Sequence, residues 1–134
     1  MGNAIACFLA GDIRGRVKLY PQFPGVMVTA EIFGLSDGFH GFHIHDGEDC
    51  SGVDFSNSGS HYNPEGQKHP MHAGDLPPIL SCGGKSYLAF YTDRFCITDV
   101  IGKTLVIHEN RDDFSTQSAG DAGRKIACAK IICC

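Results

Sequence analysis

The sequence predicts an all-β protein, folded as an eight-stranded Greek-key β-barrel or immunoglobulin-like sandwich, on three observations. No segment sustains the 3.6-residue periodicity of an amphipathic helix. The 17 glycines and six prolines interrupt the chain every few residues, as turn residues do. Eight short runs of alternating or β-branched residues stand between most of these turns, at a spacing typical of sandwiches and barrels. In chain order the runs are AIACFL (4–9), RVKLYPQ (16–22), VMVTAEIF (26–33), GFHIH (41–45), SYLAFYT (86–92), RFCITDV (94–100), TLVIHE (104–109) and KIACAKII (125–132).

The fourth run combines a candidate site with part of the core. It places His43 and His45 at positions i and i+2, which in a strand lie on one face about 7 Å apart. Both imidazoles can therefore reach one metal ion, while Phe42 and Ile44 turn into the core. The seventh run ends in His108, and the end of a neighbouring strand is a natural third anchor for the same ion.

His40 is expected to stay out of this group. If the strand is regular, His40 has the opposite parity from His43. We therefore expect a surface histidine, or one that supports a ligand without binding metal itself.

Two segments lack any strand pattern and are long for loops of a compact domain, residues 46–80 and 109–124. Loops of this length are usually functional or disordered. Three more histidines lie in the first segment, and the second directly follows His108. Function is therefore the favoured explanation for both.

The grouping of the histidines indicates a metal centre. A lone histidine is more often a hydrogen-bonded core or loop residue, but six of the seven lie on two strand ends or in one loop. Ligation almost entirely by imidazole suits Cu(II), Zn(II), Ni(II) and non-haem iron and disfavours Mg²⁺ and Ca²⁺. His69, His72 and Asp75, at i, i+3 and i+6, can form a tetrahedral zinc site with one more histidine. His61 is the candidate shared ligand, and a second, more open metal would be held by His43, His45 and His108.

Length and charge limit the class of protein. A chain of 134 residues predicts one domain over residues 1–134. The net charge of -4, with 19% charged residues, argues against nucleic acid or an anionic membrane as partner and favours a small one. No apolar run approaches the roughly 20 residues of a membrane span. The N-terminal residues lack the features of a secretory signal, so the expected location is the cytoplasm, or the periplasm or exterior if a signal has been removed.

Cysteine metal sites are disfavoured, because none of the seven cysteines forms a C-x-x-C pair. We expect Cys7, Cys82 and Cys96 to be buried or half-buried apolar residues. The final pair, Cys133 and Cys134, could chelate a soft metal, cross-link chains or have no role at a frayed chain end.

Four motifs resemble, in order and over nearly the whole chain, those of the copper-zinc superoxide dismutase family. They are GFHIHD, GSHYNPEGQKHPMHAGDLP, VIGKTLVIHENRDD and GDAGRKIAC. The resemblance implies a Greek-key β-barrel, an oxidoreductase that uses copper and zinc, and the superoxide anion as substrate. It implies copper bound by His43, His45, His61 and His108, and zinc bound by His61, His69, His72 and Asp75, with His61 as the bridging imidazolate.

Further residues take roles from the same resemblance. Cys50 and Cys128 correspond to the intrasubunit disulfide, which would tether the first long loop to the last strand. Asp112 corresponds to the carboxylate that links a copper-binding to a zinc-binding imidazole, the alternative being a solvated loop aspartate or an Asx-turn. In the implied mechanism copper cycles between Cu(II) and Cu(I), and His61 carries a proton to the second superoxide.

The chain departs from the family pattern at the cation that guides the anion. Lys125 stands where the family has an arginine, and Arg124 is displaced by one position. Adjacent residues of an extended chain point apart, so we expect Lys125 to face copper, the alternative being that both are surface charges. The loop 109–124 lacks the longer, Glu- and Lys-bearing loop of eukaryotic relatives, which predicts slower or less salt-sensitive capture of superoxide. The segment HPMH (69–72) is also shorter than in the animal enzymes of the family, which makes zinc binding the less secure of the two expectations.

The alternative function is a non-catalytic copper or zinc binding protein that buffers or delivers metal. A relative that has lost catalysis would be expected to lack a copper ligand, and here all four positions are histidine. Family members pair through different faces, so a homodimer is possible.

Overall fold

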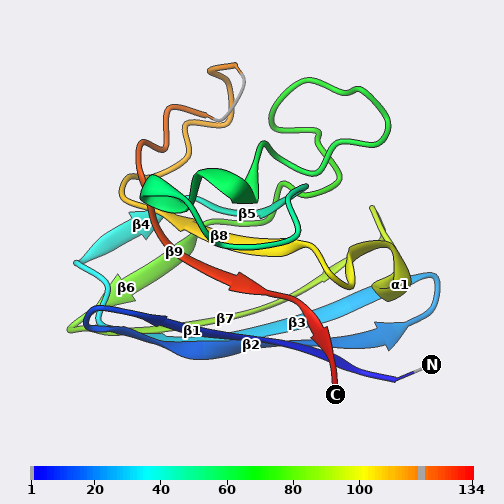
Figure 1. The fold of residues 1–134 in the computed structure, drawn as a ribbon, viewed down its shortest axis with the longest axis horizontal. Coiled ribbons are helices and arrows are strands. Elements are labelled where there is room, and N and C mark those ends of the chain that lie inside the picture. The colour runs from blue at the N-terminus through cyan, green and yellow to red at the C-terminus, as the bar shows by residue number, and fades with distance from the viewer. Residues whose placement is uncertain (1, 118–119) are drawn as a thin grey trace.

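The computed structural model describes residues 2–117 and 120–134, which form two antiparallel sheets packed face to face (Figure 1). The larger sheet contains, in spatial order, β10 (Ile132–Cys133), β1 (Ala4–Ala10), β2 (Ile13–Gln22), β3 (Gly25–Phe33), β7 (Lys85–Thr92), β6 (Ile79–Cys82) and β4 (Gly38–His40). The smaller sheet contains β5 (Phe42–His45), β8 (Thr104–His108) and β9 (Lys125–Lys130). The chain crosses between the sheets so that β3 pairs with β7, and the predicted all-β Greek-key sandwich is confirmed.

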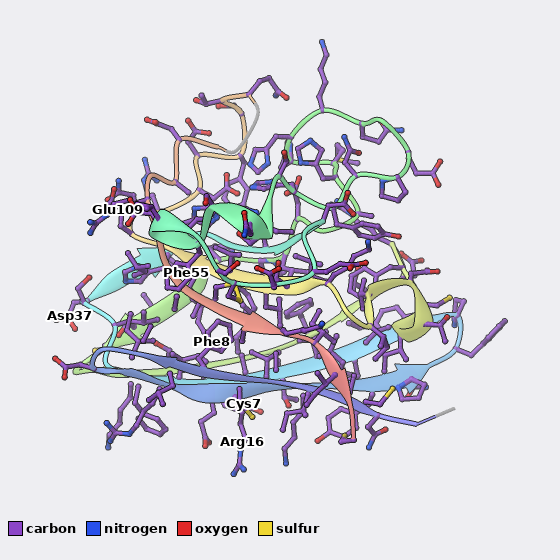
Figure 2. All side chains as sticks on the ribbon, in the orientation of Figure 1. Cys7, Phe8, Arg16, Asp37, Phe55 and Glu109 are labelled. Atoms are coloured by element: carbon purple, nitrogen blue, oxygen red, sulfur yellow. A yellow bond between two sulfur atoms is a disulfide. The ribbon has the colours of Figure 1, made fainter. Side chains whose placement is uncertain are left out.

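The core lies between the two sheets and follows strand parity. Phe8 of β1 is buried between the layers, while Cys7 and its cross-strand partner Arg16 point away from them (Figure 2). The expectation that Cys7 is buried is therefore wrong, and the same holds for Cys82 and Cys96, which are also exposed. The pattern of alternation, rather than the apolar character of a thiol, decides which side chains enter the core.

The smaller sheet is buried on both faces. Every residue of β5 and β8 is buried, because one face meets the core and the other lies beneath the long loops (Figure 1). This arrangement lets Phe42 and Ile44 pack in the core while the alternate residues of β5 meet the loops.

The structure departs from the predictions in three segments. RFCITDV does not form a strand but contains the short helix α1 (Ile97–Val100), whose start is capped because the Cys96 backbone N–H donates to Asp99 Oδ2 over 2.8 Å. GFHIH forms a strand only from Phe42, because Gly41 carries the chain from β4 into β5 of the other sheet. The predicted loop 46–80 holds the 3₁₀ helix η1 (Val53–Ser58) and the start of β6. The described residues thus contain ten strands instead of eight.

The predicted disulfide is confirmed. Cys50 and Cys128 are bonded, with a Cα–Cα distance of 5.8 Å, so the first long loop is tied to β9. The second predicted loop, 109–124, includes residues 118 and 119, which lie outside the described residues. Within the described part of the chain, no helix has the length and apolarity needed to cross a membrane.

Candidate metal centre

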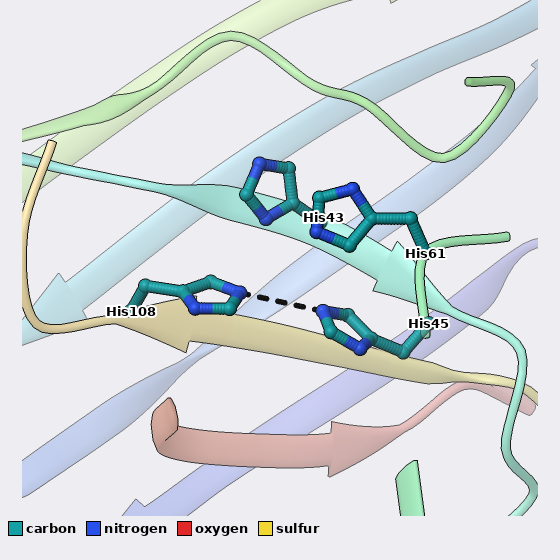
Figure 3. Close-up of side chains that lie close together, drawn as sticks. All are labelled: His43, His45, His61 and His108. Atoms are coloured by element: carbon teal, nitrogen blue, oxygen red, sulfur yellow. Dashed lines mark hydrogen bonds between the residues drawn. The ribbon is translucent and has the colours of Figure 1, made fainter. Parts of the chain in front are cut away.

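Four histidines converge on the loop-facing side of the smaller sheet. His43 and His45 project from β5, His108 ends β8, and His61 comes from the first loop, where it forms an isolated β-bridge with His45 (Figure 3). One ring nitrogen from each of the four lies within 4.8 Å of the others, and all four residues are buried. The structure thus brings together the whole predicted copper set.

Close packing holds this group in place. His45 Nε2 and His108 Nε2 are 3.3 Å apart, and the rings of His43 and His61 stack with their centroids 3.9 Å apart. Gly41 lies beside them, and a Cβ there would stand 2.8 Å from the Cβ of Ala122 and 3.2 Å from His43 Cε1. Glycine is therefore required where the chain passes between the two sheets.

A second cluster surrounds Asp75. His61 Nδ1 lies 2.8 Å from Asp75 Oδ1, and His72 Nδ1 lies 3.1 Å from Asp75 Oδ2 and 3.2 Å from His61 Nδ1. His69 Nδ1 is 3.2 Å from Asp75 Oδ2. The four predicted zinc residues are therefore neighbours in space.

The most compact group on this side contains His43 in place of the predicted His72, together with His61, His69 and Asp75. However, His43 Nε2 donates to Asp112 over 2.7 Å, so His43 has only Nδ1 left for a metal. In the predicted copper set, that nitrogen would be the copper ligand. His72 therefore stays the predicted fourth zinc ligand.

The unpaired ring nitrogens fit bound metal ions. Within residues 2–117 and 120–134, three buried imidazole nitrogens have no hydrogen-bond partner, namely His43 Nδ1, His61 Nε2 and His69 Nδ1. Buried polar atoms without partners are rare because they are costly, and a cation would satisfy all three. His61 has Nδ1 at the Asp75 cluster and leaves Nε2 for the four-histidine group, so one ring can serve both sites.

The ionisation of these residues suits metal binding. Burial lowers the pKa of His43 and His72, lowers that of His45 well below its ordinary value and lowers that of His108 to about 3, so their rings are neutral at pH 7. Burial alone would raise the pKa of Asp75, but the hydrogen bond from His61 and the nearby histidines hold it below its ordinary value. Neutral imidazoles and an ionised carboxylate are the forms that coordinate a cation.

Asp112 links the two clusters. Its carboxylate accepts hydrogen bonds from His43 Nε2 at 2.7 Å and His69 Nε2 at 2.6 Å, and Oδ1 also accepts the backbone N–H of Phe114 at 2.7 Å. Burial would raise the pKa of Asp112, but these three donors lower it well below its ordinary value. Asp112 therefore makes both the predicted link between the two imidazoles and the Asx-turn that was the alternative.

Lys125 reaches the cavity above the four-histidine group, whereas Arg124 does not. The Lys125 ammonium donates to Ser58 Oγ and the Gly59 carbonyl, both at 2.8 Å, and it borders a cavity of about 370 Å³ that His45, His61 and His108 also line. Burial lowers the pKa of Lys125. Arg124 is exposed and its Nε lies 3.6 Å from Glu109 Oε2.

His40 is buried, so the surface alternative for this residue is wrong. Its Nδ1 lies 2.8 Å from the carbonyl oxygen of His108 and its Nε2 lies 2.8 Å from that of Ser36. The sheet crossing at Gly41 places this ring beneath the backbone of His108. His40 therefore supports the site without joining the metal-facing group.

Two residues near the site were missed from sequence. Arg94 and Gln117 hydrogen-bond to the backbone between His69 and His72. Neither stands in a metal-binding motif, and Arg94 falls within a run that predicts a strand. A single polar residue of this kind carries no sequence signal.

Comparison with known proteins gives consistent matches. The family model described as copper/zinc superoxide dismutase matches residues 13–131. Superoxide dismutase [Cu-Zn] A of Xenopus laevis is 35% identical over 147 residues, covering 96% of each chain. A putative superoxide dismutase [Cu-Zn] of Orgyia pseudotsugata multicapsid polyhedrosis virus is 30% identical over 148 residues, also covering 96% of each. The crystal structure of the clock protein EA4 superposes with a TM-score of 0.91 at 32% identity, covering 99% of this chain and 95% of that one.

Proposed function

The chain belongs to the copper/zinc superoxide dismutase family, whose cofactors are copper and zinc, and we propose from this that it converts superoxide to dioxygen and hydrogen peroxide. In the proposed site His43, His45, His61 and His108 hold copper, and His61, His69, His72 and Asp75 hold zinc. The observation that carries the proposal is the position of His61, whose Nδ1 meets the Asp75 cluster while the buried Nε2 has no partner among the described residues.

Dismutation consumes two superoxide anions and two protons for each dioxygen and hydrogen peroxide. When bound, copper supplies the one-electron oxidation and reduction, and zinc, which has no redox chemistry, holds the shared imidazole. His61 Nε2 is the protein atom suited to carry one of the protons, because it is buried at the four-histidine group and its ring is fixed through Nδ1. Asp112 fixes the orientation of His43 and His69 by accepting a hydrogen bond from the Nε2 of each ring.

Lys125 attracts the anion through its charge more than through hydrogen bonds. Its three N–H groups have three acceptors at hand, Ser58 Oγ, the Gly59 carbonyl and, at 3.5 Å, the Phe55 carbonyl. An arginine in this place would keep further donors free for a bound anion. We therefore propose that the cavity admits small anions and binds them weakly.

The test is metal content after purification, with dismutase activity measured before and after loading with copper and zinc. Activity that appears only with copper bound supports the proposal. Copper bound at one equivalent without activity would favour the metal-buffering alternative instead. His61→Ala, which removes the shared ring, should abolish activity in the same assay.

We also propose that the chain works in an oxidising compartment. The Cys50–Cys128 disulfide supports an oxidising compartment, since cytosolic thiols are kept reduced. A homodimer stays a prediction, and sedimentation velocity of the purified chain tests it.

A further inference from the structure

We propose that Arg94 and Gln117 are positioning residues that preform the zinc half-site by holding the backbone of residues 69–72, called here the zinc segment. This inference rests on the proposed function, because it takes His69 and His72 as zinc ligands. The zinc segment lies in the first long loop, where contacts from other parts of the chain must keep these ligands in place.

Gln117 holds the first residue of the zinc segment from the second long loop. Its Oε1 accepts the backbone N–H of His69 at 3.0 Å, and its Nε2 donates to the His69 carbonyl at 2.9 Å. A side-chain amide that pairs with both groups of one residue fixes that residue in translation and in rotation. The ring of His69 is held from the same loop, because its Nε2 donates to Asp112.

Arg94 holds the other end of the zinc segment. Its Nη1 donates to the carbonyls of Pro70 at 3.0 Å and His72 at 3.1 Å, and its Nη2 lies 3.8 Å from Met71 Sδ. Phe95, the next residue, is buried in the core, so the arginine extends from a fixed part of the chain. The guanidinium thus joins the carbonyls on either side of Met71, the second of which belongs to the proposed ligand His72.

Almost every polar backbone group of the zinc segment is engaged by these contacts. The His72 N–H donates to Asp75 Oδ2 at 3.0 Å, the His72 carbonyl accepts from the Asp75 N–H at 3.0 Å, and the Met71 N–H donates to the Lys68 carbonyl at 2.7 Å. Only Asp75 among these partners is itself a proposed ligand. The geometry of the ligand backbone therefore depends on protein contacts that do not need the metal.

A preformed segment binds zinc without first being ordered, so the ordering entropy does not reduce the affinity. The two clamps hold the same four-residue segment, so they belong to one network of contacts and we expect their effects to be coupled. Among the described residues, neither clamp hydrogen-bonds to a member of the copper set, whose histidines lie on β5, at the end of β8 and at position 61 of the first long loop, so copper binding should change less than zinc binding.

The experiment compares Arg94→Met, Gln117→Met and the double variant in the full-length chain. Zinc affinity is measured by competition with a chromophoric chelator, and site geometry by the visible spectrum of Co²⁺ bound in place of zinc. Arg16→Met and Gln22→Met are the matched controls, because both residues are exposed on β2 of the larger sheet, whereas the site lies on the smaller sheet and the long loops. Figure 2 shows Arg16 on the face away from the site. We expect about tenfold weaker zinc binding for each clamp variant and a larger loss for the double, with an altered Co²⁺ spectrum and little change in copper affinity.

Two results would overturn the inference. Zinc affinities equal to those of the matched controls would show that the clamps do not position the ligands. Equal losses at the copper and zinc sites would show a general loss of structure instead. A wild-type chain that binds copper but no zinc would contradict the proposed zinc ligands themselves, a failure distinct from that of the clamps alone.

Discussion

Replacing Gly120 by alanine should weaken zinc binding through Asp112. Gly120 has a φ of +71°, and a Cβ there would collide with Asp112 Oδ1 and stand 2.5 Å from His69 Nε2. The left-handed backbone costs about 1 kcal/mol for a residue with a Cβ. Displacing the carboxylate would also break its hydrogen bond to His69, and losses of this kind reduce metal affinity by about 10- to 100-fold, or about 1.4 to 2.7 kcal/mol.

Gly11→Ala separates the two effects. Gly11 has a similar φ of +60°, and no atom lies within 4 Å of a Cβ built there. This variant should lose about 1 kcal/mol of unfolding free energy but keep wild-type zinc affinity. Zinc affinity is measured by chelator competition, and stability by urea unfolding of the metal-free chain. Equal zinc affinities for Gly120→Ala and Gly11→Ala would refute the reasoning, because the Asp112 contact would then have no effect.

Three more predictions test the site and the fold. Lys125→Met should lower the dismutation rate about tenfold and reduce its dependence on ionic strength, whereas Arg124→Met should have little effect on either quantity. Stopped-flow assays at several salt concentrations measure both. Equal effects of the two variants would exclude Lys125 as the residue that guides the anion. Replacing Cys50 and Cys128 by serine should cost about 4 kcal/mol of unfolding free energy, because the bond closes a loop of 78 residues, and a loss below about 1 kcal/mol in urea unfolding would contradict this. The metal-free chain should lose stability as the pH falls from 6.5 to about 3. In the unfolded state His108 takes up a proton below its ordinary pKa of 6.5, whereas burial in the folded state lowers the pKa of His108 to about 3, so protons favour the unfolded state over this range. The expected slope is about 1.4 kcal/mol per pH unit for this residue, and a His108→Gln variant with the same slope would count against it.

Sequence alone determined the features that depend on local periodicity and on residue chemistry. Strand alternation indicated that His43 and His45 share a face while Ile44 enters the core, and the structure has this arrangement. The four motifs, in their order, resembled those of one family, and that resemblance implied the disulfide. The donor types by themselves disfavoured Mg²⁺ and Ca²⁺, because nearly all of the donors are imidazoles.

Tertiary structure decided whatever depends on where distant segments meet. The sheet crossing at Gly41 buried His40 beneath the carbonyl of His108, 68 residues further along the chain. Gln117 meets His69 across 48 residues of chain, and Arg94 meets His72 across 22. Periodicity describes one segment at a time, so contacts between loops, which hold the zinc segment in place, appear only once the two sheets have packed and brought those loops together.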